Sequence, residues 1–250
     1  MKRKYGLRWQ KSDKRDLLYT PHAKLLADRP VMVNLRDQMP AIYDQENIGS
    51  CTAQSVCALM EYLNMKQGDI FEPSRLYTYY NNRVMMGWWY LFIDSGATIR
   101  DSIKSVAKYG ICAESLWPYD TKKYWRTPPA KAYADGKKQQ ALQYEAVVNL
   151  HEHIETRLAE GFPVDLGIPI YTSFQSEAAA KTGVVPMPVP ATETLLGGHA
   201  VLCIGYDRDK QIYYMRNSWG EEWGDKGYFT IPYQYMKELA SDLWTITLVE

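Results

Sequence analysis

Three polar side chains that could act together in nucleophilic catalysis are spread along the sequence. Cys51 follows a Gly-Ser pair, His199 follows two glycines, and Asn217 is followed by Ser-Trp-Gly. A cysteine attacks a carbonyl group as its thiolate, and a helix N-terminus or a neighbouring imidazolium lowers the pKa of the thiol. An asparagine oxygen can accept the ring N–H of a histidine and hold the imidazole in one orientation. Together the three residues predict acyl transfer through a covalent intermediate at Cys51.

The four histidines leave one good candidate for the general base. An isolated cysteine such as Cys51 is commonly a small buried apolar side chain, so the prediction of a nucleophile depends on its partner. His151 and His153 lie two positions apart on a predicted helix, point in different directions and make a poor metal pair. His22 lies near the polar N-terminus. His199 follows glycines that allow a second chain segment to come close, and it is the candidate base.

Acyl transfer also needs hydrogen-bond donors for the negative charge that develops on the carbonyl oxygen. The backbone N–H of Cys51 is one candidate, and the side chain of Gln45, six positions earlier, is another. A glutamine in a loop is more often solvated, which is the alternative for Gln45. Trp219 and Trp223 are expected to shield the histidine–asparagine hydrogen bond from water, with plain core packing as the alternative. Arg216 is expected on the surface of a strand.

These stretches resemble the papain-like cysteine peptidases over roughly residues 30–250. The downstream block that begins at Asn217 is the most specific part of the likeness. The motifs that carry the resemblance are DQENIGSCT around Cys51, SGA at 95–97, GGHA around His199, WPYD at 117–120, and NSWGEEWGDKGY at 217–228.

The resemblance implies a papain-like two-lobe fold of the α+β class. It implies a helical N-terminal lobe, a β-barrel-like C-terminal lobe and an active-site cleft between them. Across this cleft His199 is expected beside Cys51, and Gln45 is expected to act as an oxyanion donor. The resemblance implies no metal and no cofactor. Two positions depart from the family pattern, because Ile48 replaces a second cysteine and Thr52 replaces an aromatic residue.

Contacts with the substrate are expected on both sides of this cleft. Gly96 lacks a side chain and would let an extended peptide approach, although a simple turn glycine is the alternative. By resemblance, Ala97, Thr98, Gly167 and Ala200 would border the main specificity pocket. Small residues there leave room for a bulky apolar side chain.

The composition excludes several classes of partner. Lys+Arg and Asp+Glu both number 29 in 250 residues, so no net charge draws the chain to nucleic acid or to an anionic membrane. No apolar run approaches the roughly 20 residues that span a bilayer, and no signal peptide is visible. Four scattered cysteines fit a reducing compartment. We therefore expect a cytoplasmic protein without membrane insertion, and export by a non-classical route stays open.

Apolar residues recur at helical spacing in the first half of the chain and form strand-like runs in the second half. This change predicts a helical lobe at about 45–145 and a β-rich lobe at about 146–250. The predicted helices lie between 50 and 68, between 73 and 87, between 98 and 110, and at 151–160. The predicted strands lie at 164–170, 200–206, 211–216, 227–231 and 243–249.

Two segments are expected to lie outside these lobes. Residues 1–29 are predicted to form an N-terminal extension ahead of a peptidase domain at 30–250. The extension either covers the cleft as a non-standard plug or forms a disordered or surface-packed leader. The connection at 171–196 is expected to be a long unstructured loop that faces the substrate, because such loops are commonly binding loops, and an insertion without function is the alternative.

The sequence favours a cysteine peptidase, and endopeptidase activity is preferred over exopeptidase activity. Its expected partner is a polypeptide substrate, and its oligomeric state stays open. One alternative is another acyl transfer on the same site, such as transglutaminase or amidase chemistry. The other is a binding or structural protein that kept the fold without catalysis.

Overall fold

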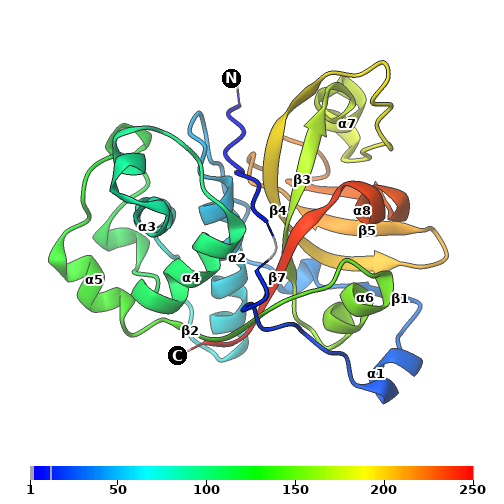
Figure 1. The fold of residues 1–250 in the computed structure, drawn as a ribbon, viewed down its shortest axis with the longest axis horizontal. Coiled ribbons are helices and arrows are strands. Elements are labelled where there is room, and N and C mark those ends of the chain that lie inside the picture. Colours follow the sequence, from blue (N-terminus) through cyan, green and yellow to red (C-terminus); the bar gives the residue numbers. More distant parts are fainter. Residues whose placement is uncertain (1–2, 12, 250) are drawn as a thin grey trace.

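The computed structural model describes residues 3–11 and 13–249, and it arranges them as helices beside an antiparallel sheet (Figure 1). This mixture confirms the predicted α+β class. The helices are α1 (Ala23–Ala27), α2 (Cys51–Lys66), α3 (Arg75–Met86), α4 (Ile99–Tyr109), α5 (Ala130–Gly136), α6 (His151–Ala159), α7 (Glu177–Thr182) and α8 (Tyr233–Leu239). The strands are β1 (Met32–Asn34), β2 (Ala141–Ala146), β3 (Val164–Tyr171), β4 (Leu195–Asp207), β5 (Ile212–Arg216), β6 (Tyr228–Pro232) and β7 (Ser241–Val249).

The sheet follows the strand order β2-β7-β3-β4-β5-β6, and β1 pairs with β4. Every pairing between these strands is antiparallel. Among the described residues β6 makes no ladder with β2, so the sheet is open. The expected barrel-like form is therefore corrected to an open sheet. In the ladder of β3 and β4, His199 lies opposite Ile168 and Ala200 opposite Gly167.

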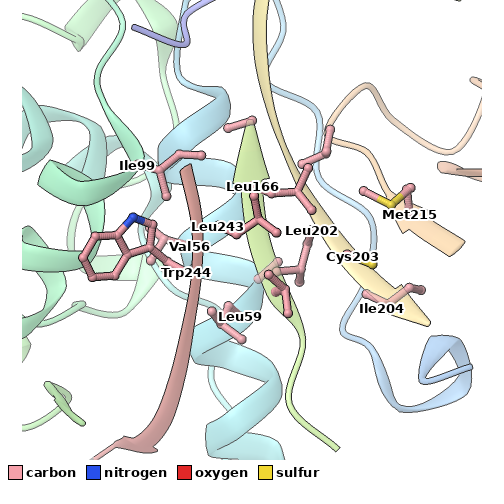
Figure 2. Close-up of a cluster of buried hydrophobic side chains, with 14 of the residues drawn as sticks. Val56, Leu59, Ile99, Leu166, Leu202, Cys203, Ile204, Met215, Leu243 and Trp244 are labelled. Atoms are coloured by element: carbon pink, nitrogen blue, oxygen red, sulfur yellow. The ribbon is translucent and has the colours of Figure 1, made fainter. Parts of the chain in front are cut away.

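Helix α2 belongs to the core of the molecule, because 13 of its 16 residues are buried and its surroundings are apolar on most sides. Figure 2 shows Val56 and Leu59 of α2 in one cluster with Ile99 of α4, Leu166 of β3 and Leu202 of β4. This packing fixes the start of α2, and hence Cys51, against the middle of the sheet.

Local capping explains where the next two helices begin. Ser74 Oγ accepts a hydrogen bond from the backbone N–H of Tyr77, so α3 starts at the predicted place. Thr98 Oγ1 accepts one from Asp101 N–H and starts α4. A glycine follows each helix, with φ +129° at Gly87 and +68° at Gly110, because a left-handed backbone ends a helix most easily at glycine. The predicted helices and strands are present within about two residues of their expected bounds, except that β4 begins five residues early, at Leu195, and so includes His199.

Two expectations are wrong. Arg216 is buried, because the segment at 40–43 covers the end of β5, and its guanidinium donates to the carbonyl oxygens of Pro40 (2.6 Å) and Ala41 (2.5 Å). These carbonyl oxygens accept the hydrogen bonds that the guanidinium would otherwise donate to water, so the charged side chain can be buried. The connection at 171–196 is not unstructured, since it contains a 3₁₀ helix at Thr172–Gln175 and α7.

Residues 3–11, here called the N-terminal segment, run between the helices and the sheet (Figure 1). Leu7 N–H donates to Gly198 O on β4 (3.1 Å), and Arg8 N–H donates to Ala97 O before α4 (2.9 Å). One short stretch therefore bridges the two sides of the molecule. Residues 1, 2 and 12 of the predicted extension lie outside the described residues.

Candidate active site

Cys51 is the first residue of α2 and is fully buried. The backbones of Ala200, Gly6 and Thr52 lie near its thiol, close enough to lower its pKa. Because Ala200 follows His199 on β4, the start of α2 lies beside the strand that carries the candidate base. The helix start is reached through Ser50, whose hydroxyl contacts the hydroxyl of Tyr119 (2.7 Å) rather than a backbone N–H of α2.

The side chain of His199 is held in one tautomer by its neighbours. Its Nε2 lies 2.8 Å from Asn217 Oδ1, and that oxygen also accepts the backbone N–H of Ser218 at 2.8 Å. The second bond identifies the Asn217 atom as the acceptor, so His199 Nε2 must carry the proton. Among the described residues Nδ1 has no hydrogen-bond partner. The neutral ring therefore has a free lone pair available to take a proton from a thiol.

Burial makes the neutral forms of both groups the stable ones in this arrangement. It raises the pKa of the Cys51 thiol to about 11, more than the three neighbouring backbones lower it. It lowers the pKa of His199 to about 4, against the opposing effect of the hydrogen bond to Asn217. At pH 7 the thiol and the imidazole are therefore both uncharged. The expected pKa-lowering effect of the helix start is present but smaller than the effect of burial.

Gln45 is also fully buried, and its amide is oriented by Ser218. Gln45 Oε1 accepts the Ser218 hydroxyl at 2.9 Å, so the Nε2 group points to the other side, where it donates to Lys4 O and Ile48 O, both at 3.0 Å. Lys4 belongs to the N-terminal segment. Both donor bonds of Gln45 are thus used by carbonyl oxygens of the chain, and one of these belongs to the N-terminal segment.

Sequence reasoning missed two positioning residues. Ser218 holds both Asn217 and Gln45, and its only signal was its place inside the NSWG motif. Asp94 accepts the backbone N–H of Gly49 at 3.0 Å, two residues before Cys51. Asp94 carried no signal, because a single aspartate in a loop is common.

The two tryptophans differ in what they contact. Trp219 lies against the ring of His199, with ring centroids 5.0 Å apart, and is almost fully buried. Trp223 stacks on Phe174 at 5.3 Å and meets Trp219 edge to face at 5.1 Å. Trp219 therefore lies over the candidate base, and Trp223 supports it from behind.

Three of the five predicted substrate contacts, Gly96, Ala97 and Gly167, lie against the N-terminal segment. Ala97 pairs with it through both its N–H and its carbonyl. A side chain on Gly96 would collide with Gly6 O, and one on Gly167 would come within 2.5 Å of the Leu7 side chain. Ala200 reaches the thiol of Cys51. Thr98 differs from the other four, since its hydroxyl is used to cap α4.

Within the described part of the chain, no group of three or more His, Cys, Asp and Glu side chains is arranged to hold a metal ion. The four cysteines are free thiols and buried. No helix in residues 3–11 and 13–249 is long and apolar enough to cross a membrane.

Comparison with known proteins agrees with this geometry. A family model described as papain family cysteine protease matches residues 29–242. The chain belongs to the papain family. It is 35% identical, over 98% of its own length and 86% of the relative, to a peptidase C1-like protein of Acanthamoeba polyphaga mimivirus.

Solved structures of papain-family proteins give the same result. Xylellain, a cysteine protease from Xylella fastidiosa, is 36% identical and superposes with a TM-score of 0.89 over 100% of this chain and 99% of that one. A procathepsin B from Trypanosoma congolense, at 17% identity, has a TM-score of 0.77 over 98% and 86% of the two chains, and supports the fold alone.

Proposed function

We propose that this papain-family protein hydrolyses peptide bonds through an acyl-enzyme on Cys51, with His199 as base and then acid. The observation that carries the proposal is the hydrogen bond from His199 Nε2 to Asn217 Oδ1, which leaves the buried Nδ1 without a partner among the described residues. A binding module would have no need for that arrangement. Membership of the family supports a polypeptide substrate.

The reaction follows from the atoms present. His199 Nδ1 takes the proton of the Cys51 thiol, and the thiolate attacks the substrate carbonyl carbon. The protonated imidazole then gives its proton to the leaving amine, and the C–N bond breaks. His199 next takes a proton from water, whose oxygen attacks the carbonyl carbon of the thioester. The C–S bond breaks, the acid leaves, and the imidazolium returns its proton to the Cys51 sulfur. Asn217 keeps the ring in its productive tautomer through both steps.

The developing oxyanion would be stabilised by the backbone N–H of Cys51 and by Gln45 Nε2. Support comes from Lys4 O, which already accepts a hydrogen bond from Gln45 at 3.0 Å. A carbonyl oxygen can therefore occupy the place where an oxyanion needs a donor. Trp219 would keep water from the bond between His199 and Asn217.

We further propose that the N-terminal segment holds the full chain in a closed, inactive state. Its residues take the contacts that a substrate would need, as Lys4 O occupies Gln45 and Gly6 reaches the thiol. Its pairing with Ala97 is parallel, through Leu7. Of the two sequence-based interpretations of residues 1–29, the described part favours the plug.

The closure can be opened by one substitution in the full chain. A Cβ on Gly6 would collide with Gly49 O, so Gly6→Val cannot keep the segment in place. We expect Gly6→Val to shorten unfolded polypeptides at least about 10-fold faster than wild type, a change of 1.4 kcal/mol. Lys14→Val, at an exposed position of the same extension, is the matched control and should behave as wild type.

The products separate this proposal from its alternatives. They are measured by mass spectrometry with Gly6→Val and with Gly6→Val/Cys51→Ala. Shortened chains that depend on Cys51 support the peptidase. Glutamine converted to glutamate without shortening would indicate an amidase, and joined chains a transglutaminase. No reaction in Gly6→Val would favour a binding protein. Endopeptidase activity, which we prefer, requires internal cleavage sites.

A further inference from the structure

A cluster of large apolar side chains is exposed on the loop between α3 and α4. The loop consists of residues 88–93, here called the aromatic loop, and includes a 3₁₀ helix at Trp88–Phe92. Trp88, Trp89, Phe92 and Ile93 are 57%, 68%, 67% and 55% exposed. Single exposed apolar residues are normal, but a contiguous group on a soluble protein usually marks a binding surface.

The backbone of the aromatic loop is held in place by hydrogen bonds from a buried arginine. The side chain of Arg83 is fully buried, and its guanidinium donates to the carbonyl oxygens of Tyr90 (3.4 Å), Leu91 (3.3 Å) and Ile93 (3.2 Å). The rings of Trp88 and Trp89 stack with centroids 3.7 Å apart. A surface that is already ordered loses little conformational entropy when a partner binds.

The aromatic loop is continuous with the candidate active site. Its next residue, Asp94, binds the N–H of Gly49 and the ammonium of Lys4 (2.7 Å). Within the loop, the Tyr90 ring lies 5.2 Å from the guanidinium of Arg8. Arg8 is also the residue whose N–H pairs with Ala97 O. A chain that follows the path of the N-terminal segment therefore passes along the aromatic loop as it leaves the site.

We propose that the aromatic loop binds an apolar stretch of the substrate polypeptide beyond the residues that lie at Cys51. This inference rests on the proposed peptidase function. It is favoured over an anionic lipid surface because residues 84–99 contain no Lys or Arg. The basic side chains beside the loop, Lys4 and Arg8, belong to the N-terminal segment, whose place the substrate would take. Proteins that bind anionic membranes place Lys or Arg beside the apolar side chains. Trp and Phe instead offer large rigid contact areas to apolar side chains of a peptide.

The test is a binding measurement that needs no turnover. The full chain with Gly6→Val and Cys51→Ala is titrated with labelled peptides that share one core sequence. Each peptide carries a Leu- and Phe-rich tail or a Gly-Ser tail, at either end of the core. We expect at least one apolar-tailed peptide to bind about 10-fold tighter than its Gly-Ser counterpart, measured by fluorescence anisotropy.

The advantage of the apolar tail should disappear in a chain that also carries Trp88→Ser, Trp89→Ser and Phe92→Ser. Trp89→Ser alone changes the most exposed of these positions and should lose part of the advantage of the apolar tail. This single variant is the control in case the triple variant misfolds. Leu142→Ser with Leu248→Ser removes exposed apolar side chains from β2 and β7 and should leave the advantage intact.

Several results would overturn the proposal. Equal affinity for both tails, or no binding of either, would show that the loop does not recognise the substrate. Loop-dependent binding of phosphatidylcholine vesicles without a peptide preference would assign the loop to lipid, and a loop-dependent dimer would assign it to a second copy. If peptide binding depended on the aromatic loop but Gly6→Val hydrolysed no peptide, the proposed binding surface would be supported. Only the proposed peptidase activity would be contradicted.

Discussion

At the scale of single residues, the site depends on hydrogen bonds that fix which atoms carry protons. Ser218 N–H selects the oxygen of Asn217, and that oxygen selects the protonated Nε2 of His199. Asn217→Ala in the Gly6→Val chain removes this selection. We expect kcat to fall about 10- to 100-fold with little change in KM, because orientation of a base, not substrate affinity, is lost. Steady-state hydrolysis of a peptide measures both.

The control for this prediction is another asparagine whose side chain bonds to the backbone. Asn149 donates to Met236 O and Ala240 O, both at 3.0 Å and outside the site. Asn149→Ala should lower stability and leave kcat unchanged. An equal loss of kcat in both variants would mean that Asn217 acts through the fold alone.

Gln45 gives a second prediction at this scale. Gln45→Ala in the Gly6→Val chain should lower kcat about 10²- to 10³-fold, because one oxyanion donor is removed. Single-turnover acylation with a peptide ester is the measurement. Gln67→Ala, at the end of α2, should have no such effect. If Gln45→Ala raised only KM, Gln45 would be a substrate contact and not an oxyanion donor.

The chemistry-bearing residues could be predicted from the sequence because their types and motifs are specific. Cys51, His199 and Asn217 were predicted; the structure joins His199 to Asn217 by a hydrogen bond and places Cys51 at the start of α2, which packs against β4. Their catalytic roles stay predictions. Ser218 and Asp94 could not be predicted, since each acts by a contact with a distant backbone or amide group. Such contacts depend on the folded geometry and leave no local pattern.

At the scale of elements, the helices and strands that position the site follow from local signals, as the caps of α3 and α4 show. The path of the N-terminal segment does not follow from local signals. It depends on the close approach of Gly6, Gly49 and Gly96, which come from three distant parts of the chain. Glycine patterns predict flexibility of the backbone but not its distant partner.

Helix α2 and strand β3 are joined by a buried acid whose titration should be measurable. Asp165 is fully buried and accepts a hydrogen bond from the Ser55 hydroxyl. Burial raises the pKa of Asp165 to about 8. In the unfolded chain an aspartate ionises near pH ~3.9, so the unfolded state binds fewer protons between the two pKa values. The free energy of unfolding should therefore fall as pH rises through this interval.

Asp165→Asn keeps an acceptor for Ser55 and removes the titration. We expect it to add at least about 1 kcal/mol more stability at pH 8 than at pH 4, as measured by urea unfolding. Asp209→Asn, at an exposed position, is the matched control and should add the same at both pH values. A pH-independent effect of Asp165→Asn would contradict the raised pKa.

At the scale of the whole molecule, the N-terminal segment joins the helices to the sheet and covers the site. Its ion pairs, such as that of Lys4 with Asp94, are each exposed to solvent on at least one partner, and exposed pairs contribute little. Buried contacts contribute more, among them the side chain of Leu7, which is 7% exposed and packs against Gly167. Closure is therefore expected to persist at moderate salt.

The central claim is that the N-terminal segment closes a peptidase site at Cys51. The pH dependence of Cys51 alkylation, mapped by mass spectrometry in wild type and Gly6→Val, tests this claim most directly. In wild type, Cys51 should react as slowly as the buried Cys57, Cys112 and Cys203 up to about pH 9, since burial raises its pKa to about 11. In Gly6→Val it should react selectively below its unperturbed pKa of about 8.5, and addition of His199→Ala should abolish this. Fast labelling of wild type at pH 7, or no change in Gly6→Val, would contradict the account.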